Sequence, residues 1–290
     1  MSYLEDILKS TGDTTPIIKQ KSVSGGDINE AFYVRTKAQE YFAKRNKGAS
    51  SRFFQTEARG LELLRQTGAI DVPRVYHHGG NEEEAWLVLE YIPAGTTSPL
   101  SEHRLGERLS RMHAMENSAY GFDQPTFIGE LLQENHMYPS WLEYYRSERL
   151  LPQIKLAGEK GKLPPDREKR AHQLLEHLDT WIPEDPGSSL LHGDLWGGNW
   201  MTGPEDTPYL IDPSVLYGDR LMDLAFTELF GGYSRDFYEA YAAYTPLPDY
   251  YQDVKPLYQL FYLFVHLNMF GEAFGSQVDR ILTHYTETKG

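Results

Sequence analysis

The stretch Ser189–Met201, SLLHGDLWGGNWM, joins a short apolar run to a loop rich in glycine and polar residues. Leu190 and Leu191 are typical of a buried strand, and Gly, Asp and Asn are typical of the turn after it. Asp194 is followed five residues later by Asn199, with no Lys or Arg between them. A plain polar loop explains each residue type taken alone, so the surrounding sequence has to decide whether this loop carries chemistry.

A second acid strengthens the chemical interpretation of this loop. Asp212 follows Asn199 by 13 residues and comes directly after the apolar run Tyr209-Leu210-Ile211. Phosphoryl transfer from a nucleotide needs a group that accepts a hydroxyl proton, oxygen ligands for a metal ion, and a lysine on the phosphates. Carboxylate and amide oxygens suit Mg²⁺. The spacing therefore indicates Asp194 as the proton acceptor, Asn199 and Asp212 as Mg²⁺ ligands, and a nucleotide as the phosphate donor.

The required lysine is found upstream, in a predicted strand. Lys44 lies in EYFAKRN, and Glu57 lies 13 residues later in a predicted helix, on one stripe with Phe54, Leu61 and Leu64. An acid on the apolar side of a helix needs a partner, because burying an unpaired charge is costly. Lys44 is the natural partner, and the pair would hold its ammonium over the phosphates of a nucleotide. A purely structural ion pair, or two unrelated exposed charges, is the alternative.

Two further segments are candidates for nucleotide binding. Gly25 and Gly26 join two predicted strands, and their backbone N–H groups can approach a phosphate closely. Glu90, Tyr91 and Ile92 close the last predicted strand, where the backbone can pair with an adenine edge. An ordinary hairpin turn and an ordinary strand end explain these two segments equally well.

The chain changes character near residue 92, which predicts two domains, 1–92 and 93–290. The first shows five strand-like segments, 16–23, 28–36, 40–46, 73–78 and 84–92, with one helix that begins at Ser50 or Ser51 and ends at Gly68. The second shows mainly helical patterns, 101–115, 138–157, 166–181, 219–230, 234–244 and 254–287. We expect an α+β fold of two lobes, a five-stranded antiparallel sheet with a helix and a larger helical lobe.

Composition excludes several classes of protein. The 290 residues include no cysteine, so disulfides and thiolate metal sites are excluded, and a reducing compartment, the cytoplasm, is expected. A net charge of −14 argues against a nucleic-acid surface. The longest uncharged stretch, 256–271, has only 16 residues, which favours a buried helix over a membrane span. The N-terminus lacks the pattern of a signal peptide.

The chain resembles the fructosamine kinase (ketosamine-3-kinase) family, which has an aminoglycoside-phosphotransferase-like, protein-kinase-like fold. The resemblance runs almost end to end, through SVSGGDINEAF, FAKRN, FFQTEARGLELL, LVLEYI, LLHGDLWGGNW and LIDPSVLYGDRLMDLAFTELFGG. It implies Asp194 as proton acceptor, Asn199 and Asp212 as Mg²⁺ ligands, and Lys44 with Glu57 on ATP. The implied substrate is a ketoamine, such as a sugar rearranged on a protein lysine, phosphorylated on its 3-hydroxyl for deglycation.

Some features stay open at this level. Asp223 resembles the acid that braces the catalytic loop in this fold, but an acid in the first turn of a helix needs no such role. Leu221 stands where many relatives carry an acid. Two other functions compete, a kinase of the same fold for aminoglycosides, choline or sugars, and a non-catalytic nucleotide-binding module. The sequence does not rank the ketoamines and leaves the oligomeric state undetermined.

Overall fold

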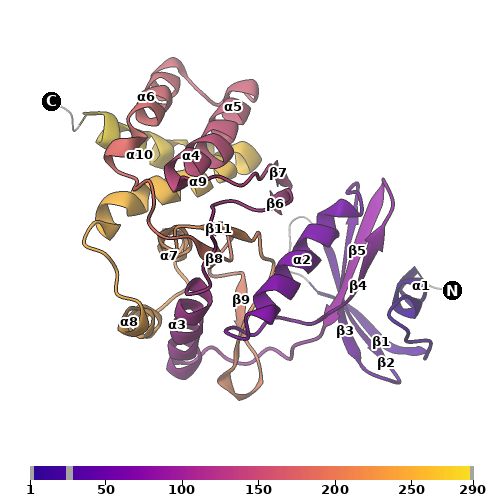
Figure 1. Ribbon diagram of the computed structural model, residues 1–290. Coiled ribbons are helices and arrows are strands. Elements are labelled where there is room, and N and C mark those ends of the chain that lie inside the picture. Colours follow the sequence, from indigo (N-terminus) through magenta and orange to yellow (C-terminus); the bar gives the residue numbers. More distant parts are fainter. Residues whose placement is uncertain (1–2, 24–28, 288–290) are drawn as a thin grey trace. The chain divides into compact units, whose positions relative to one another are not determined.

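A computed structural model describes residues 3–23 and 29–287 of the chain. The chain forms two compact units, each built from segments that are distant in sequence, as the colours of Figure 1 show. Unit 1 comprises Met1–Arg111, Gly198–Ser214 and Ser234–Tyr241, and unit 2 comprises Met112–Gly197, Val215–Tyr233 and Ala242–Gly290. The predicted functional division into 1–92 and 93–290 stays a prediction.

Unit 1 is built on one antiparallel sheet. Its strands are β1 (Ile17–Val23), β2 (Glu30–Thr36), β3 (Glu40–Lys47), β4 (Val75–Gly80) and β5 (Glu84–Glu90), in the order β1-β2-β3-β5-β4. Every neighbouring pair is antiparallel. The five-stranded antiparallel sheet expected from the sequence is therefore confirmed.

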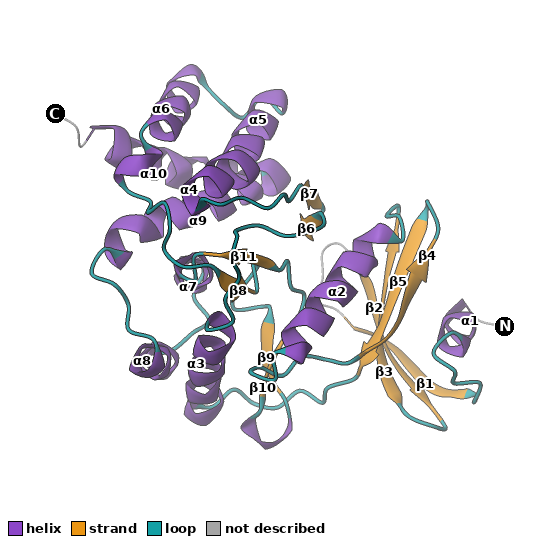
Figure 2. Ribbon diagram, in the orientation of Figure 1, coloured by secondary structure: helices purple, strands orange, loops and turns teal. Residues whose placement is uncertain are grey.

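Two helices cover opposite faces of this sheet (Figure 2). On one face, α1 (Tyr3–Lys9) packs Leu4, Ile7 and Leu8 against Tyr41 and Ala43 of β3. On the other face, α2 (Arg52–Gln66) contacts β4 and β5. Side chains of a strand alternate between the two faces, so Lys44 points away from α1 and toward α2.

The ends of α2 differ in part from the expected caps. Ser51 occupies the N-cap position, but its side chain accepts no capping hydrogen bond, so the expected serine cap is absent there. At the other end, the backbone N–H of Gly68 donates to the carbonyl of Arg65 at 3.1 Å, with Gly68 at φ +64°. A left-handed residue of this kind commonly ends a helix, and glycine adopts it without strain.

Two further helices and one hairpin complete unit 1, and the last residues of both helices are assigned to unit 2. The helices are α3 (Pro99–His113) and α8 (Arg235–Tyr244), and the hairpin pairs β9 (Trp200–Thr202) with β10 (Pro208–Leu210). The backbone N–H of Leu210 donates to the carbonyl of Asp71 at 2.9 Å. This bond ties the hairpin to the segment between α2 and β4.

Unit 2 is mainly helical, as expected. Its helices are α4 (Trp141–Tyr144), a π-helix (Tyr145–Leu150), α5 (Leu151–Glu159), α6 (Pro165–Glu176), α7 (Leu221–Leu229), α9 (Tyr251–Phe270) and α10 (Gly275–Glu287). Helix α9 packs against α5, α7 and α10, and most of its side chains are buried. Two short antiparallel pairs complete the unit, β6 (Thr126–Ile128) with β7 (Leu131–Gln133) and β8 (Ser189–Leu191) with β11 (Leu216–Gly218).

The expectation of one helical segment over 254–287 was wrong. Helix α9 ends at Phe270, because Gly271 adopts φ +92°, and a 3₁₀ turn over Glu272–Phe274 leads into α10. Most residues avoid this backbone region, and glycine enters it without steric cost. In the described ranges 3–23 and 29–287, no helix combines the length and apolar character that a membrane crossing requires.

Candidate active site

Residues 192–199 of the quoted motif form a loop between two short strands. Unit 2 includes the loop up to Gly197, and unit 1 includes it from Gly198 onward. Strand β8 ends at Leu191, and β9 begins at Trp200. Asp194 is partly exposed, whereas Leu195 beside it is fully buried and anchors the loop. Gly193, just before Asp194, adopts φ +81°, a conformation that glycine enters without strain. The backbone N–H of Asp194 donates to Nδ1 of His192 at 3.2 Å.

Asp223 of α7 fixes the start of this loop. Its fully buried carboxylate accepts the backbone N–H groups of His192 at 2.7 Å and of Gly193 at 2.9 Å. Nε2 of His113 lies 3.2 Å from the same carboxylate. Tyr262 of α9 donates its hydroxyl to the carbonyl of Gly193 at 3.1 Å. Asp223 therefore holds the backbone of the two residues immediately before Asp194. The simpler explanation, that Asp223 only stabilises the N-terminus of its own helix, was wrong.

After Asp194, the loop packs closely against a second backbone segment, where Gly197 meets Gly231 and Gly232. A Cβ added at Gly197 would lie 2.8 Å from the carbonyl oxygen of Gly231 and 3.0 Å from Cα of Gly232. Both atoms belong to the backbone and cannot rotate away. Gly197 of the motif is therefore required on steric grounds, since only glycine fits there without moving the loop.

Lys44, Glu57 and Asp212 form one charge cluster within unit 1. Nζ of Lys44 lies 2.8 Å from Oε1 of Glu57 and 2.5 Å from Oδ1 of Asp212. The Lys44 and Glu57 side chains are 7% and 12% exposed, whereas that of Asp212 is 42% exposed. The pairing of Lys44 with Glu57 that the sequence suggested is present, and one acid of the cluster remains accessible to a ligand.

Burial and neighbouring charges both act on this cluster. Burial lowers the pKa of the Lys44 ammonium, but the carboxylates of Asp212 and Glu57 outweigh that effect and raise the pKa above its ordinary value. Burial raises the pKa of the Glu57 carboxyl to about 7, against the opposing effect of Lys44. Lys44 therefore stays cationic at neutral pH and offers a fixed positive charge to an anionic ligand.

The two predicted metal ligands lie on adjoining backbone segments of unit 1. The backbone N–H of Ile211 donates to the carbonyl of Asn199 at 3.0 Å. Asp212 is the residue after Ile211, so its backbone lies close to that of Asn199. Asp212 adopts φ +55°, an uncommon conformation for a residue with a side chain and one that occurs often at functional sites. Mg²⁺ is commonly bound by one or two protein oxygens together with phosphates and water. The amide of Asn199 and the carboxylate of Asp212 fit that donor set.

The described part of the chain contains no larger metal cage. No group of three or more His, Cys, Asp or Glu side chains suited to a metal ion occurs among its residues. A pair of oxygen ligands that needs phosphates to complete it is a different kind of site, so this finding does not bear on Asn199 and Asp212.

The predicted adenine segment follows β5 within unit 1. The backbone N–H of Glu90 donates to the carbonyl of Arg74 at 2.8 Å, and the Tyr91 ring meets Tyr33 edge-on with centroids 4.6 Å apart. Ile92 is 8% exposed and lies against Gly203, where an added Cβ would be 3.0 Å from its side chain. The other nucleotide-binding candidates, Gly25 and Gly26, lie outside the described residues.

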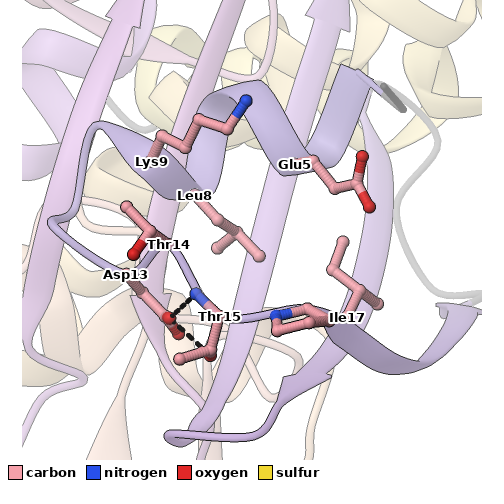
Figure 3. A pocket seen from close by; sticks show the side chains of 8 residues that line it. Glu5, Leu8, Lys9, Asp13, Thr14, Thr15 and Ile17 are labelled. Carbon is pink, nitrogen blue, oxygen red and sulfur yellow. Dashed lines mark hydrogen bonds between the residues drawn. The ribbon is translucent and has the colours of Figure 1, made fainter.

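A surface pocket lies elsewhere in unit 1, between α1 and the start of β1 (Figure 3). Asp13 forms part of its lining and accepts hydrogen bonds from the backbone and the hydroxyl of Thr15, at 2.8 and 2.6 Å. None of the described residues predicted to act in catalysis or nucleotide binding lines this pocket. The candidate site therefore rests on the motif loop and the charge cluster.

Comparisons with known proteins identify the family to which this chain belongs. The model of the fructosamine kinase family matches residues 2–288. A probable ketoamine kinase of Lactiplantibacillus plantarum is 41% identical over 278 residues, which cover 93% of this chain and 95% of that protein. The crystal structure of a candidate fructosamine-3-kinase from Haemophilus somnus has a TM-score of 0.87 at 26% identity and covers 97% of this chain and 96% of its own.

A more distant structure shares the fold alone. A thermostable mutant of an aminoglycoside phosphotransferase, solved with AMP-PNP and hygromycin B, has a TM-score of 0.63 at 17% identity. The match covers 97% of this chain and 98% of that one. The protein-kinase-like architecture expected from the sequence is confirmed by these structures.

Proposed function

Because this chain belongs to the fructosamine kinase family and is a phosphotransferase directed at ketoamines, we propose that it transfers the γ-phosphate of ATP to the 3-hydroxyl of the ketoamine sugar. The observation that carries the proposal is the buried Lys44 ammonium, held between Glu57 and Asp212 at 2.8 and 2.5 Å. A preorganised cation of this kind stabilises the negative charge of a nucleoside triphosphate.

In the proposed reaction, Asp194 accepts the proton of the sugar hydroxyl while that oxygen bonds to the γ-phosphorus and ADP leaves. The braced backbone of His192 and Gly193 orients Asp194 for this step. Glu57 orients Lys44 on the phosphates. Glu90, Tyr91 and Ile92 line the adenine, and Gly25 and Gly26 contact the phosphates.

Asn199 and Asp212 are the residues that would hold Mg²⁺. The ion, when bound, neutralises charge on the phosphates and favours the departure of ADP. Asp212 would then exchange its contact with Lys44, in whole or in part, for the metal. Its exposed side chain and the uncommon backbone conformation support that use.

The biological role that we propose is deglycation. A ketoamine formed on a protein lysine carries the same sugar hydroxyl as a free ketoamine, and phosphorylation at the 3-position converts it to a less stable adduct. The name of the Lactiplantibacillus plantarum relative supports ketoamines as the substrate class, and AMP-PNP in the aminoglycoside phosphotransferase supports ATP as the donor.

The test is phosphate transfer from ATP to a panel of ribulosamines, erythrulosamines and fructosamines, with mass spectrometry to locate the new phosphate. Aminoglycosides, choline and free sugars serve as competing acceptors. We expect ATP- and Mg²⁺-dependent transfer to at least one ketoamine, at O3. Transfer only to a competing acceptor, or ATP binding without transfer to any ketoamine, would contradict the proposal.

A further inference from the structure

Four aromatic side chains of unit 2 form a cluster that reaches the surface. The cluster consists of Phe230 after α7, His266 and Phe270 of α9, and Phe274 of the following turn. His266 lies 4.8 Å from Phe230, 5.5 Å from Phe270 and 5.0 Å from Phe274, measured between ring centroids. Phe270 is 54% exposed and Phe230 is 41% exposed. Adjoining exposed rings are unfavourable in water, so a patch of this kind commonly marks a binding surface.

A series of ring contacts connects this aromatic cluster with the motif loop. Phe226 lies 5.9 Å from Phe230 and stacks on Tyr262 with centroids 3.6 Å apart and an interplanar angle of 6°. The Tyr262 hydroxyl donates to the carbonyl of Gly193, the residue before Asp194. The cluster is therefore the exposed end of an aromatic layer whose buried end supports the proposed proton acceptor.

His266 gives the cluster one defined polar group. Its Nδ1 lies 2.8 Å from the carbonyl of Tyr262, and because a carbonyl only accepts, Nδ1 carries the proton. Burial lowers the pKa of the His266 imidazole, so the ring is neutral at neutral pH and Nε2 holds a free lone pair. The cluster thus combines ring faces and edges with one hydrogen-bond acceptor, and it carries no charge.

A ketoamine differs from a free sugar by the amine-derived group, the aglycone, attached through nitrogen to C1. When O3 is presented to Asp194, the aglycone extends away from the reacting hydroxyl and needs a surface of its own. Within unit 2, the exposed aromatic cluster adjoins the Asp194 loop, because Phe230 directly precedes Gly231, whose backbone packs against Gly197 of that loop. An apolar aglycone gains from covering these rings, whereas a single methyl group covers little of them.

We propose that the aromatic cluster binds the apolar aglycone of the substrate and makes the enzyme selective for ketoamines of amines with an aromatic ring or an extended alkyl chain. The inference rests on the proposed function and adds a specificity site to it. Phe270 and Phe230 supply the contact surface. His266 accepts a hydrogen bond from an N–H group at the far end of the aglycone, such as a peptide N–H beyond a lysine chain.

The experiment compares ribulosamines of methylamine, butylamine and benzylamine, which share one sugar and differ only in the aglycone. We expect kcat/KM for the benzylamine adduct to exceed that for the methylamine adduct about tenfold, the effect of one buried ring. Phe270→Ala and Phe230→Ala should remove most of that ratio by lowering kcat/KM for the benzylamine adduct alone. The two side chains are 54% and 41% exposed, so folding should survive their truncation, and thermal unfolding checks this.

Leu100→Ala is the matched control, because Leu100 is 49% exposed on α3 and belongs to neither the loop nor the cluster. It should keep the parental ratio. Equal kcat/KM for all three adducts, or an unchanged ratio in both phenylalanine variants, would overturn the inference and leave the proposed function intact. Absence of transfer to every ketoamine would overturn the proposed function and the inference together.

Discussion

Replacing Asp223 by Asn perturbs the proposed proton acceptor without touching it. The buried carboxylate of Asp223 accepts the backbone N–H groups of His192 and Gly193, at 2.7 and 2.9 Å, just before Asp194. An asparagine of nearly the same shape keeps one oxygen and replaces the other by an NH₂ group. One of the two backbone donors then faces another donor and loses its acceptor.

The magnitude follows from these contacts. A buried donor without an acceptor costs about 1–3 kcal/mol, and loss of the charge on the remaining bond costs about 1 kcal/mol more. We therefore expect the free energy of unfolding to fall by about 2–4 kcal/mol. A displacement of a reacting group by about 1 Å can cost a factor of about 100, so we expect kcat to fall by about that factor with little change in the KM for ATP.

The assay combines urea unfolding with steady-state kinetics on a ketoamine. Asp219→Asn is the control, because Asp219 is equally buried but bonds to the Tyr258 hydroxyl and the Leu221 backbone N–H, away from the loop. It should keep the parental kcat. If D223N loses stability but retains the parental kcat, the carboxylate supports the fold without positioning Asp194, and the reasoning is refuted.

Two other variants and the D219N control test separate parts of the account. Glu57→Gln should weaken binding of an ATP analogue about 10- to 100-fold in calorimetry, because Lys44 loses one of its two carboxylates; parental affinity would contradict this. Asp219 has its pKa raised by burial to about 6 from 3.8, so its contribution to stability is full below about pH 4 and is lost as pH rises through 6. Because of this group, the parental protein should lose about 3 kcal/mol of unfolding free energy between about pH 4 and about pH 7.5. Urea unfolding of D219N over the same range should lack that loss, and a parental pH profile in D219N would contradict the assignment. Gly197→Ala should lower kcat at least about tenfold because its Cβ meets backbone at 2.8 Å, whereas Gly158→Ala, with its nearest atom 3.6 Å away, should not.

Local patterns in the sequence were sufficient for much of the fold and for part of the site. Alternation and turn residues predicted the five strands of unit 1, because a half-buried strand requires that pattern. The stripe that Glu57 shares with Phe54 and Leu61 predicted an acid directed at the sheet, and the contact with Lys44 follows from the alternation of β3. These features depend on neighbours within one element or between adjacent elements.

Features that depend on packing between distant segments were missed or left undecided. Asp223 looks like an ordinary first-turn acid, since nothing in the sequence shows that the loop 30 residues earlier returns to it. The steric need for Gly197 arises from Gly231 and Gly232, and glycine alone does not identify its neighbour. The contact of Asp212 with Lys44, 168 residues earlier, likewise appears only in the folded chain.

The aromatic cluster shows the same limit in another form. Phe270 and Phe274 lie in a segment that the sequence predicts as one continuous helix, and their meeting with His266 depends on the turn at Gly271. Hydrophobic periodicity predicts burial for such residues. The exposure of Phe270 is therefore a property that only the tertiary structure reveals.

The central claim is that Asp194 accepts the sugar proton while Lys44, Glu57 and Asp212 serve the nucleotide. The most direct test measures Asp194→Asn in two assays, calorimetric binding of an ATP analogue and single-turnover transfer to a ketoamine. The account predicts parental affinity for the analogue and a transfer rate that is lower by a factor of about 10²–10⁴. A parental transfer rate in D194N would contradict it.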